Sequence, residues 1–291
     1  MRIPGAARRH GQRRTRVTRG ARHAARTRAA GAAGWIPRRA GVRVRLTILG
    51  SSASYAGPGQ ACAGYLVEGG GVRVLFDCGN GVIANLARVC DPLTLDAVFL
   101  SHEHPDHLCD IYALQSLLRY APQGPAEPLR LHLPPGVFDS IGCMLSERGR
   151  SELAEAFVAH DFEPGVTVMV GELAITPVPV EHTDTTFALI AEEGPARLCY
   201  TSDARATSAV MNAATGASLL LAEATLPEAY EGRAPHLTAS QAGAIARMAG
   251  VRTLVLTHLW PTNDRDNALA EATAEFGGPV HVASELAVYD I

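Results

Sequence analysis

Residues 101–107 bring together side chains that could hold metal ions. The segment reads Ser-His-Glu-His-Pro-Asp-His and matches the pattern HxHxDH at His102, His104, Asp106 and His107. Imidazole and carboxylate groups are the ligands that hold zinc and similar divalent ions. A polar loop whose histidines cap a helix would explain one such residue, but it explains four ligand-type residues within six positions poorly. We therefore predict a metal centre here.

Three single residues further along the chain could complete a two-metal site. His182, Asp203 and His258 each follow a short apolar run of the kind that forms a buried strand. A lone His or Asp in this position is more often a turn residue, so each is weak by itself. Their shared placement at strand ends, together with the HxHxDH cluster, favours a common site.

The elements that must position these residues are short β-rich runs and amphipathic helices. An apolar strand is predicted at 97–100, and it ends directly in the cluster. Apolar residues at helical spacing predict a helix over 110–120. The other predicted strands are 45–49, 64–68, 72–77, 129–133, 166–170, 172–180, 186–191, 197–201, 219–222, 253–257, 279–283 and 285–290, and the other predicted helices are 82–89, 207–213, 239–248 and 266–275. Two successive sets of strands and helices predict two packed sheets covered by helices, an α/β fold with four αββα layers.

Taken together, these residues resemble the metallo-β-lactamase superfamily, whose signature is HxHxDH followed by single His, Asp and His ligands. The resemblance covers residues 46–291. It implies two divalent metal ions, with Zn²⁺ as the first expectation and Mn²⁺ or Fe as alternatives that the same ligands suit. The implied ligands are His102, His104 and His182 for one ion, Asp106, His107 and His258 for the other, and Asp203 as a bridge.

Two later segments, 222–225 and 236–243, resemble the ribonuclease Z-like phosphodiesterase branch of that superfamily. The resemblance implies that Glu223 orients His236, that His236 protonates the leaving oxygen, and that Asp106 is the catalytic base. The structural alternatives are that Glu223 only ends a strand and that Thr238 only caps a helix. Two ions holding a hydroxide, with a nearby proton donor, suit phosphodiester hydrolysis.

Three features separate the chain from transfer-RNA-processing members of that branch. Those members carry a long basic arm between the third His ligand and the bridging Asp, whereas His182 and Asp203 are only 21 positions apart. The chain also lacks their Gly-Leu-Pro-Gly-like run after the first cluster. Finally, residues 1–45 hold 14 of the 26 basic residues and none of the 29 acidic ones, so the rest carries formal charge −17. Such an acidic domain is unfavourable for binding a polyanion.

The sequence therefore predicts a metal-dependent phosphodiesterase for a small substrate such as a cyclic nucleotide. The form without an arm is similar to atypical cyclic-nucleotide phosphodiesterases of this superfamily found in actinobacteria. Trp260, just after His258, could stack on a purine. The alternatives are a ribonuclease Z-like transfer-RNA endonuclease, whose missing arm the Arg-rich leader would replace, and a thioester or lactone hydrolase. A metal-binding scaffold without activity is disfavoured because no ligand is missing.

The arginine-rich leader is predicted to be separate from the enzyme domain. We expect a disordered leader over residues 1–43, which could instead be translated DNA upstream of a start at Val44, and a hydrolase domain over 44–291. A polyanion-binding arm and a targeting peptide are the other interpretations. The six cysteines form no clustered framework and are predicted to be buried, reduced thiols, with Cys109 close enough to the cluster to approach the metals. We expect a cytoplasmic protein without a membrane span, and a homodimer is possible by resemblance.

Overall fold

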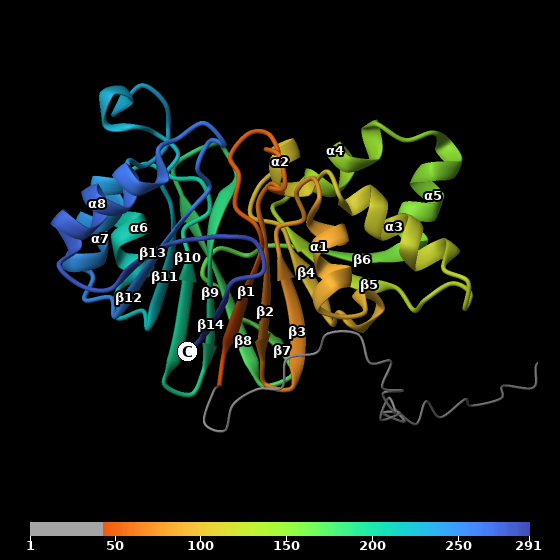
Figure 1. The fold of residues 1–291 in the computed structure, drawn as a ribbon. Coiled ribbons are helices and arrows are strands. Elements are labelled where there is room, and N and C mark those ends of the chain that lie inside the picture. Colours follow the sequence, from red (N-terminus) through yellow and green to blue (C-terminus); the bar gives the residue numbers. More distant parts are fainter. Residues whose placement is uncertain (1–42) are drawn as a thin grey trace, which may run out of the picture. The chain divides into compact units, whose positions relative to one another are not determined.

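Two seven-stranded sheets pack face to face between two outer layers of helices in the computed structural model (Figure 1). The structure describes residues 43–291, and these lie within one compact unit. The predicted αββα sandwich is confirmed. The predicted leader lies outside the described residues except for Arg43, so its boundary stays a prediction.

The first sheet has the order β14-β1-β2-β3-β4-β5-β6. Its strands are β1 (Arg45–Gly50), β2 (Gly64–Gly69), β3 (Val72–Phe76), β4 (Ala97–Phe99), β5 (Leu129–Leu133), β6 (Phe157–Asp161) and β14 (Val288–Asp290). The helical segments between them are α1 (Val82–Val89), η1 (Pro92–Thr94), α2 (Pro105–Leu108), α3 (Ile111–Tyr120), α4 (Val137–Cys143) and α5 (Glu147–Ala156). Sequence analysis predicted no elements over 134–165, where α4, α5 and β6 lie.

The second sheet has the order β13-β12-β11-β10-β9-β8-β7. Its strands are β7 (Val168–Val170), β8 (Leu173–Val180), β9 (Thr186–Glu193), β10 (Ala196–Tyr200), β11 (Leu219–Glu223), β12 (Thr253–Thr257) and β13 (Val280–Val282). The helical segments are α6 (Ser208–Ala214), η2 (Glu228–Tyr230), α7 (Ala239–Met248) and α8 (Arg265–Phe276). The last strand, β14, leaves this half of the chain and pairs antiparallel with β1, so the two sheets are not strictly the two halves of the sequence.

Three apolar layers hold the sandwich together. The central layer joins the inner faces of both sheets and includes Phe76, Phe99 and Tyr200. A second layer lies between the second sheet and α6, α7 and α8, and a third lies between the first sheet and α1, α3, α4 and α5. The central residues of β11 and β12 read as continuous apolar runs because both faces of each strand are covered, and β10 is interrupted only by the half-buried Arg197.

Parallel pairing decides where the polar strand ends meet. Strands β3, β4 and β5 are mutually parallel in the first sheet, and β10, β11 and β12 are mutually parallel in the second. Parallel strands end at the same edge of a sheet. The polar residues at the carboxyl ends of β3, β4, β10, β11 and β12 are therefore gathered at one end of the sandwich, where Figure 1 also shows α2.

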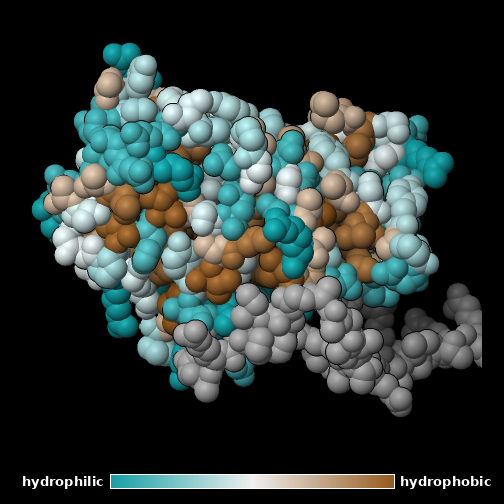
Figure 2. Space-filling model, viewed as in Figure 1, coloured by the Kyte–Doolittle hydropathy of each residue, from teal (hydrophilic) through white to brown (hydrophobic). Residues whose placement is uncertain are grey.

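The prediction for the cysteines is confirmed only in part. Cys62, Cys78, Cys90 and Cys199 are buried and all six thiols are free, but Cys143 is exposed and Cys109 is half-buried, which corrects the expectation of six buried cysteines. Figure 2 shows hydrophobic residues in separate patches among hydrophilic ones. Over residues 43–291, no helix has the length and apolar character needed to cross a membrane.

Candidate metal centre

The HxHxDH segment is shaped by the turn that leads from β4 into α2. Pro105 opens α2, a position where proline loses no helical hydrogen bond, and the His107 N–H donates to the His104 carbonyl at 3.0 Å. The loop after β3 packs tightly beneath this turn. A Cβ on Gly79 would lie 2.0 Å from the Asp106 carbonyl oxygen, so only glycine allows this approach. The short helix places Asp106 and His107 beside the two histidines that precede it.

One group of potential ligands consists of His102, His104, His182 and Asp203. His182 Nε2 lies 3.2 Å from His104 Nδ1, and both His182 Nε2 and His102 Nε2 face Asp203 Oδ2, at 3.6 and 3.7 Å. His182 Nδ1 donates to the Pro235 carbonyl at 2.9 Å, which leaves Nε2 as the nitrogen with a free lone pair.

A second group consists of Asp106, His107 and His258. His258 Nε2 lies 3.1 Å from His107 Nε2 and 3.1 Å from Asp106 Oδ2. His258 lies 151 positions from His107 in the sequence and follows β12 of the second sheet. The structure therefore brings together all seven residues predicted as metal ligands. A third possible group, Asp203, His236 and His258, shares one residue with each of the first two.

Asp203 lies between the two groups and presents a different oxygen to each. Its Oδ2 faces His102 and His182, whereas its Oδ1 lies 3.4 Å from His107 Nε2 and 3.2 Å from His258 Nδ1. Asp203 Oδ1 and His102 Nε2 are buried without a hydrogen-bond partner. Buried polar atoms are normally satisfied, so these two mark positions at which a ligand is expected.

Asp77, which sequence analysis missed, supports the first-sheet side of the centre. This fully buried carboxylate follows β3 and accepts a 2.8 Å hydrogen bond from His107 Nδ1. It also accepts bonds from the Ser101 hydroxyl at 2.8 Å and the Tyr200 hydroxyl at 2.9 Å. Ser101 Oγ in turn lies 3.0 Å from His102 Nδ1. Asp77 thus fixes the Nδ1–H tautomer of His107 directly and that of His102 through Ser101, which turns both Nε2 atoms toward the centre.

Glu223 has the corresponding role on the second sheet. It is fully buried at the end of β11, and its Oε1 accepts a 3.0 Å hydrogen bond from His236 Nδ1. Its Oε2 accepts the Thr225 hydroxyl at 2.6 Å, and the Thr225 Oγ lies 2.9 Å from His258 Nδ1. Glu223 therefore orients His236 directly and His258 through Thr225, which goes beyond the interpretation that it merely ends a strand.

His236 lies at the edge of the centre, with Nδ1 3.9 Å from Asp203 Oδ2. The residue just beyond it, Leu237, leads into α7, where Thr238 forms a capping box with Gln241. The structural interpretation of Thr238 is therefore correct. Cys109 belongs to none of the possible ligand groups among the described residues, and its N–H donates to the Pro105 carbonyl.

The electrostatics of the cluster favour added positive charge. Burial lowers the pKa of His102 well below its usual value, which keeps this ring neutral as a ligand must be. Burial would also lower the pKa of His107, but the Asp203 and Asp77 carboxylates raise it well above the usual value. Burial would raise the pKa of Asp203, yet His258 and His107 hold it well below the usual value. The buried carboxylate of Asp203 and the half-buried carboxylate of Asp106, surrounded by imidazoles, are a donor set that suits divalent ions.

The family to which the chain belongs is consistent with a metal site at this position. Residues 72–259, more than half of the chain, match the model of the beta-lactamase superfamily domain, and the chain belongs to that family. It is a metallo-hydrolase of the β-lactamase fold whose His and Asp clusters suit a divalent metal site.

Three relatives are similar to this chain over most of its length. The uncharacterized protein Rv1339 of Mycobacterium tuberculosis is 35% identical over 245 residues, which cover 82% of this chain and 89% of that protein. The structure of the metallo-beta-lactamase fold protein YhfI from Bacillus subtilis is 27% identical with a TM-score of 0.77, and the match covers 86% of this chain and all of that one. A ribonuclease Z of Myxococcus xanthus is 29% identical over 295 residues, covering 82% of this chain and 95% of that protein.

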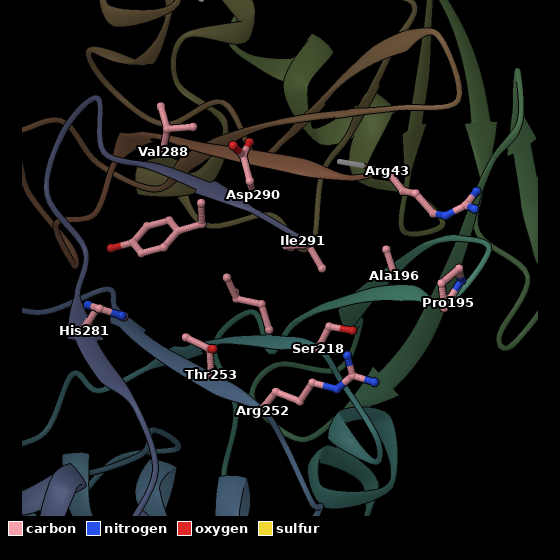
Figure 3. A pocket seen from close by; sticks show the side chains of 12 residues that line it. Arg43, Pro195, Ala196, Ser218, Arg252, Thr253, His281, Val288, Asp290 and Ile291 are labelled. Atoms are coloured by element: carbon pink, nitrogen blue, oxygen red, sulfur yellow. The ribbon is translucent and has the colours of Figure 1, made fainter. Parts of the chain in front are cut away.

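A cavity lies at the opposite end of the sandwich from the metal centre. It has a volume of about 560 Å³ and is lined by residues at the starts of β10, β11 and β12 and by the C-terminal segment (Figure 3). Arg43, Arg252 and His281 contribute to its walls, as do the apolar Leu219 and Ile291. None of the seven predicted ligands lines this cavity.

Proposed function

We propose that the protein is a two-metal phosphodiesterase that hydrolyses a small phosphodiester such as a cyclic nucleotide. The observation that carries this proposal is the position of Asp203, whose two oxygens face two separate groups of ligands. In the proposed assignment, His102, His104 and His182 hold one ion, Asp106, His107 and His258 hold the other, and Asp203 bridges them. Zinc is the first expectation, with manganese or iron as alternatives.

Two bound ions would supply a hydroxide nucleophile and neutralise charge on a phosphoryl oxygen. The residues of the chain supply the proton transfers. Asp106 is proposed as the base, and its Oδ2 is held by the Ser54 N–H at 2.6 Å and faces His258 Nε2. His236 is proposed as the acid that protonates the leaving oxygen. Burial would lower its pKa, but the hydrogen bond and the charge of Glu223 raise that pKa to about 9, so His236 carries a proton at neutral pH.

The short connection between His182 and Asp203 supports a small substrate. This interval is filled by the antiparallel pair β9 and β10, whose residues pair from Ala196 with Glu193 to Tyr200 with Leu189. The hairpin is part of the second sheet and provides no extended arm. Together with the formal charge of −17 for residues 46–291, this disfavours a long polyanionic substrate.

A ribonuclease Z-like activity on transfer RNA precursors is the second candidate. Its support is the 29% identity to the Myxococcus xanthus ribonuclease Z over most of both chains. A thioester or lactone hydrolase is a third candidate of the same fold. The hydrogen bond between Glu223 and His236 supports protonation of an alkoxide-like leaving group, which argues against a thioester because a thiolate does not need that proton.

The test is a comparison of three substrates with the full-length protein, loaded separately with zinc, manganese or iron. Cyclic AMP, a transfer RNA precursor with a 3′ extension and a thioester are assayed side by side, with Asp106→Ala as the control. We expect turnover of cyclic AMP that Asp106→Ala loses. Efficient cleavage of the precursor without turnover of cyclic AMP would favour the second candidate, and full activity of Asp106→Ala would refute the site assignment.

A further inference from the structure

Two segments that are distant in sequence form one edge of the metal centre. The loop after β1 and the residues after β12 are joined by backbone hydrogen bonds from Ala53 N–H to the Leu259 carbonyl at 3.0 Å and from Leu259 N–H to the Ser51 carbonyl at 3.1 Å. Farther out, Gly57 packs against Pro261 so closely that a Cβ would lie 2.8 Å from the proline ring. We call residues 54–57 and 260–261 the rim.

The rim is tied directly to the proposed catalytic base. Ser54 adopts a left-handed backbone conformation with φ 62°, which is uncommon for a residue other than glycine. This conformation directs its N–H to Asp106 Oδ2 at 2.6 Å, and its Oγ accepts the Trp260 indole N–H at 3.4 Å. A strained residue therefore connects Trp260 to a residue of the metal centre, and strain of this kind is commonly retained at functional sites.

The rim exposes aromatic surface beside the centre. Tyr55 follows Ser54 and is 51% exposed, and Trp260 is half-buried two positions after His258. The indole N–H of Trp260 is already bonded to Ser54, so the side chain offers a ligand mainly its ring face. A ring face binds planar groups by stacking, and every nucleobase presents such a group.

We propose that Tyr55 and Trp260 form a stacking platform for the nucleobase of the substrate while its phosphodiester lies at the metal centre. The inference rests on the proposed function for the group that is cleaved, but it concerns the other end of the substrate. It adds a recognition element that the metal cluster alone does not contain, and it assigns that element to a rim whose geometry is fixed by Ser54.

Binding can be tested without turnover because the chain has only two tryptophans, Trp35 and Trp260. In the full-length Trp35→Phe protein, tryptophan fluorescence reports on Trp260 alone. We expect AMP to quench this emission in a saturable way and ribose 5-phosphate, which has the same phosphate but no base, to leave it unchanged. Equal effects of the two ligands, or no effect of AMP, would overturn the platform.

The contribution of Tyr55 is measured in the same background. Tyr55→Ala is expected to weaken AMP binding about tenfold, which corresponds to about 1.4 kcal/mol. The matched control is Tyr120→Ala, which removes another exposed tyrosine, at the end of α3 and outside the rim. An unchanged Kd for AMP in Tyr55→Ala, or an equal loss in Tyr120→Ala, would contradict the assignment.

Turnover separates this inference from the proposed function. If cyclic AMP is a substrate, Trp260→Ala should raise its KM about tenfold with little change in kcat, whereas Trp260→Phe should retain most of the affinity. An abasic analogue of cyclic AMP, which keeps the sugar and the cyclic phosphate but lacks the base, should show the same KM in all three proteins. Turnover of cyclic AMP without base-dependent quenching would support the phosphodiesterase activity and refute the stacking platform. Base-dependent quenching without turnover of cyclic AMP would support the platform and contradict the proposed activity.

Discussion

Strands β10, β11 and β12 connect two ends of the sandwich that differ in chemistry. At their amino ends they line the cavity with Ala196, Leu219 and Thr253, and at their carboxyl ends they lead to Asp203, Glu223 and His258. Between these ends the three strands are apolar and buried except for the half-buried Arg197 in β10. The difference is therefore created by the terminal residues of the strands and by the residues that flank them, and not by the middle of the strands.

The two ends also differ in how their polar groups are held. At the carboxyl end, two buried carboxylates, Asp77 and Glu223, orient the histidines of the centre through direct bonds and through the hydroxyls of Ser101 and Thr225. At the cavity end, an ion pair joins Asp290 to Arg45 at 2.7 Å, and Arg252 is exposed. The polar groups at the carboxyl end therefore point toward the buried metal centre, whereas Arg252 at the cavity end is exposed to solvent.

Backbone strain follows the same division. Five residues other than glycine have a positive φ within residues 43–291, and four of them lie at the carboxyl end: Ser54, Asp77, Ser202 and His258. Such conformations cost of order 1–3 kcal/mol each, so they persist only where the surrounding packing enforces them. Strained residues are therefore concentrated at the end of the sandwich that holds the metal centre. The apolar core beneath that end holds these residues in place.

The largest effect is expected from removing the bridge between the two ligand groups. Asp203→Ala should reduce hydrolysis to the level of the metal-free protein, because both proposed ions lose a ligand. Metal analysis of the purified variant should show fewer than two ions per chain. Wild-type metal content with wild-type activity would remove the distinction between the two ends.

A smaller loss is expected when the proposed acid is replaced. His236→Asn should lower kcat by about 10²- to 10⁴-fold, the usual contribution of a general acid, with metal content unchanged. The pKa of His236 is raised to about 9, so the protonated, active form dominates below that value and is lost as the pH rises through it. The wild-type kcat profile should fall on the alkaline side, and the variant should lack that descent. An identical descent in the variant would assign it to another group.

Replacing Asp77, the buried carboxylate that orients His107, should have an intermediate effect on metal binding. Asp77→Asn preserves the shape of the side chain but removes the charge that holds His107 Nδ1, and it should weaken metal affinity by about 10- to 100-fold. Titration with a competing chelator measures this change. Tyr200→Phe removes only one of the hydroxyls that donate to Asp77, so it should have a smaller effect. An unchanged metal affinity in Asp77→Asn would argue that Asp77 acts only through packing.

The smallest effect is expected at the cavity end. Arg252→Ala alters an exposed residue at the start of β12, so stability should change by no more than about 0.5 kcal/mol, and kcat and KM should stay within about twofold of wild type. Thermal unfolding and steady-state kinetics provide the measurements. A marked loss of activity would show that the two ends are coupled and not chemically separate.

The amino-acid sequence by itself determined the types and order of the candidate ligands and most of the strands. HxHxDH is a local pattern, and strand ends followed by His182, Asp203 and His258 can be read from short apolar runs. Asp77 shares this placement after β3, but the predicted strand over 72–77 included it. Its position just beyond the last apolar residue, Phe76, was the available signal.

Only the tertiary structure decided how these residues support one another. Asp77 lies 123 positions from Tyr200, and Ser54 lies 52 positions from Asp106 and 206 from Trp260, so no local spacing encodes their hydrogen bonds. The return of β14 to the first sheet is equally non-local. Local pattern specifies which side chains reach a strand end. The packing of two sheets, which fixes the distance and orientation between those ends, decides which atoms meet there.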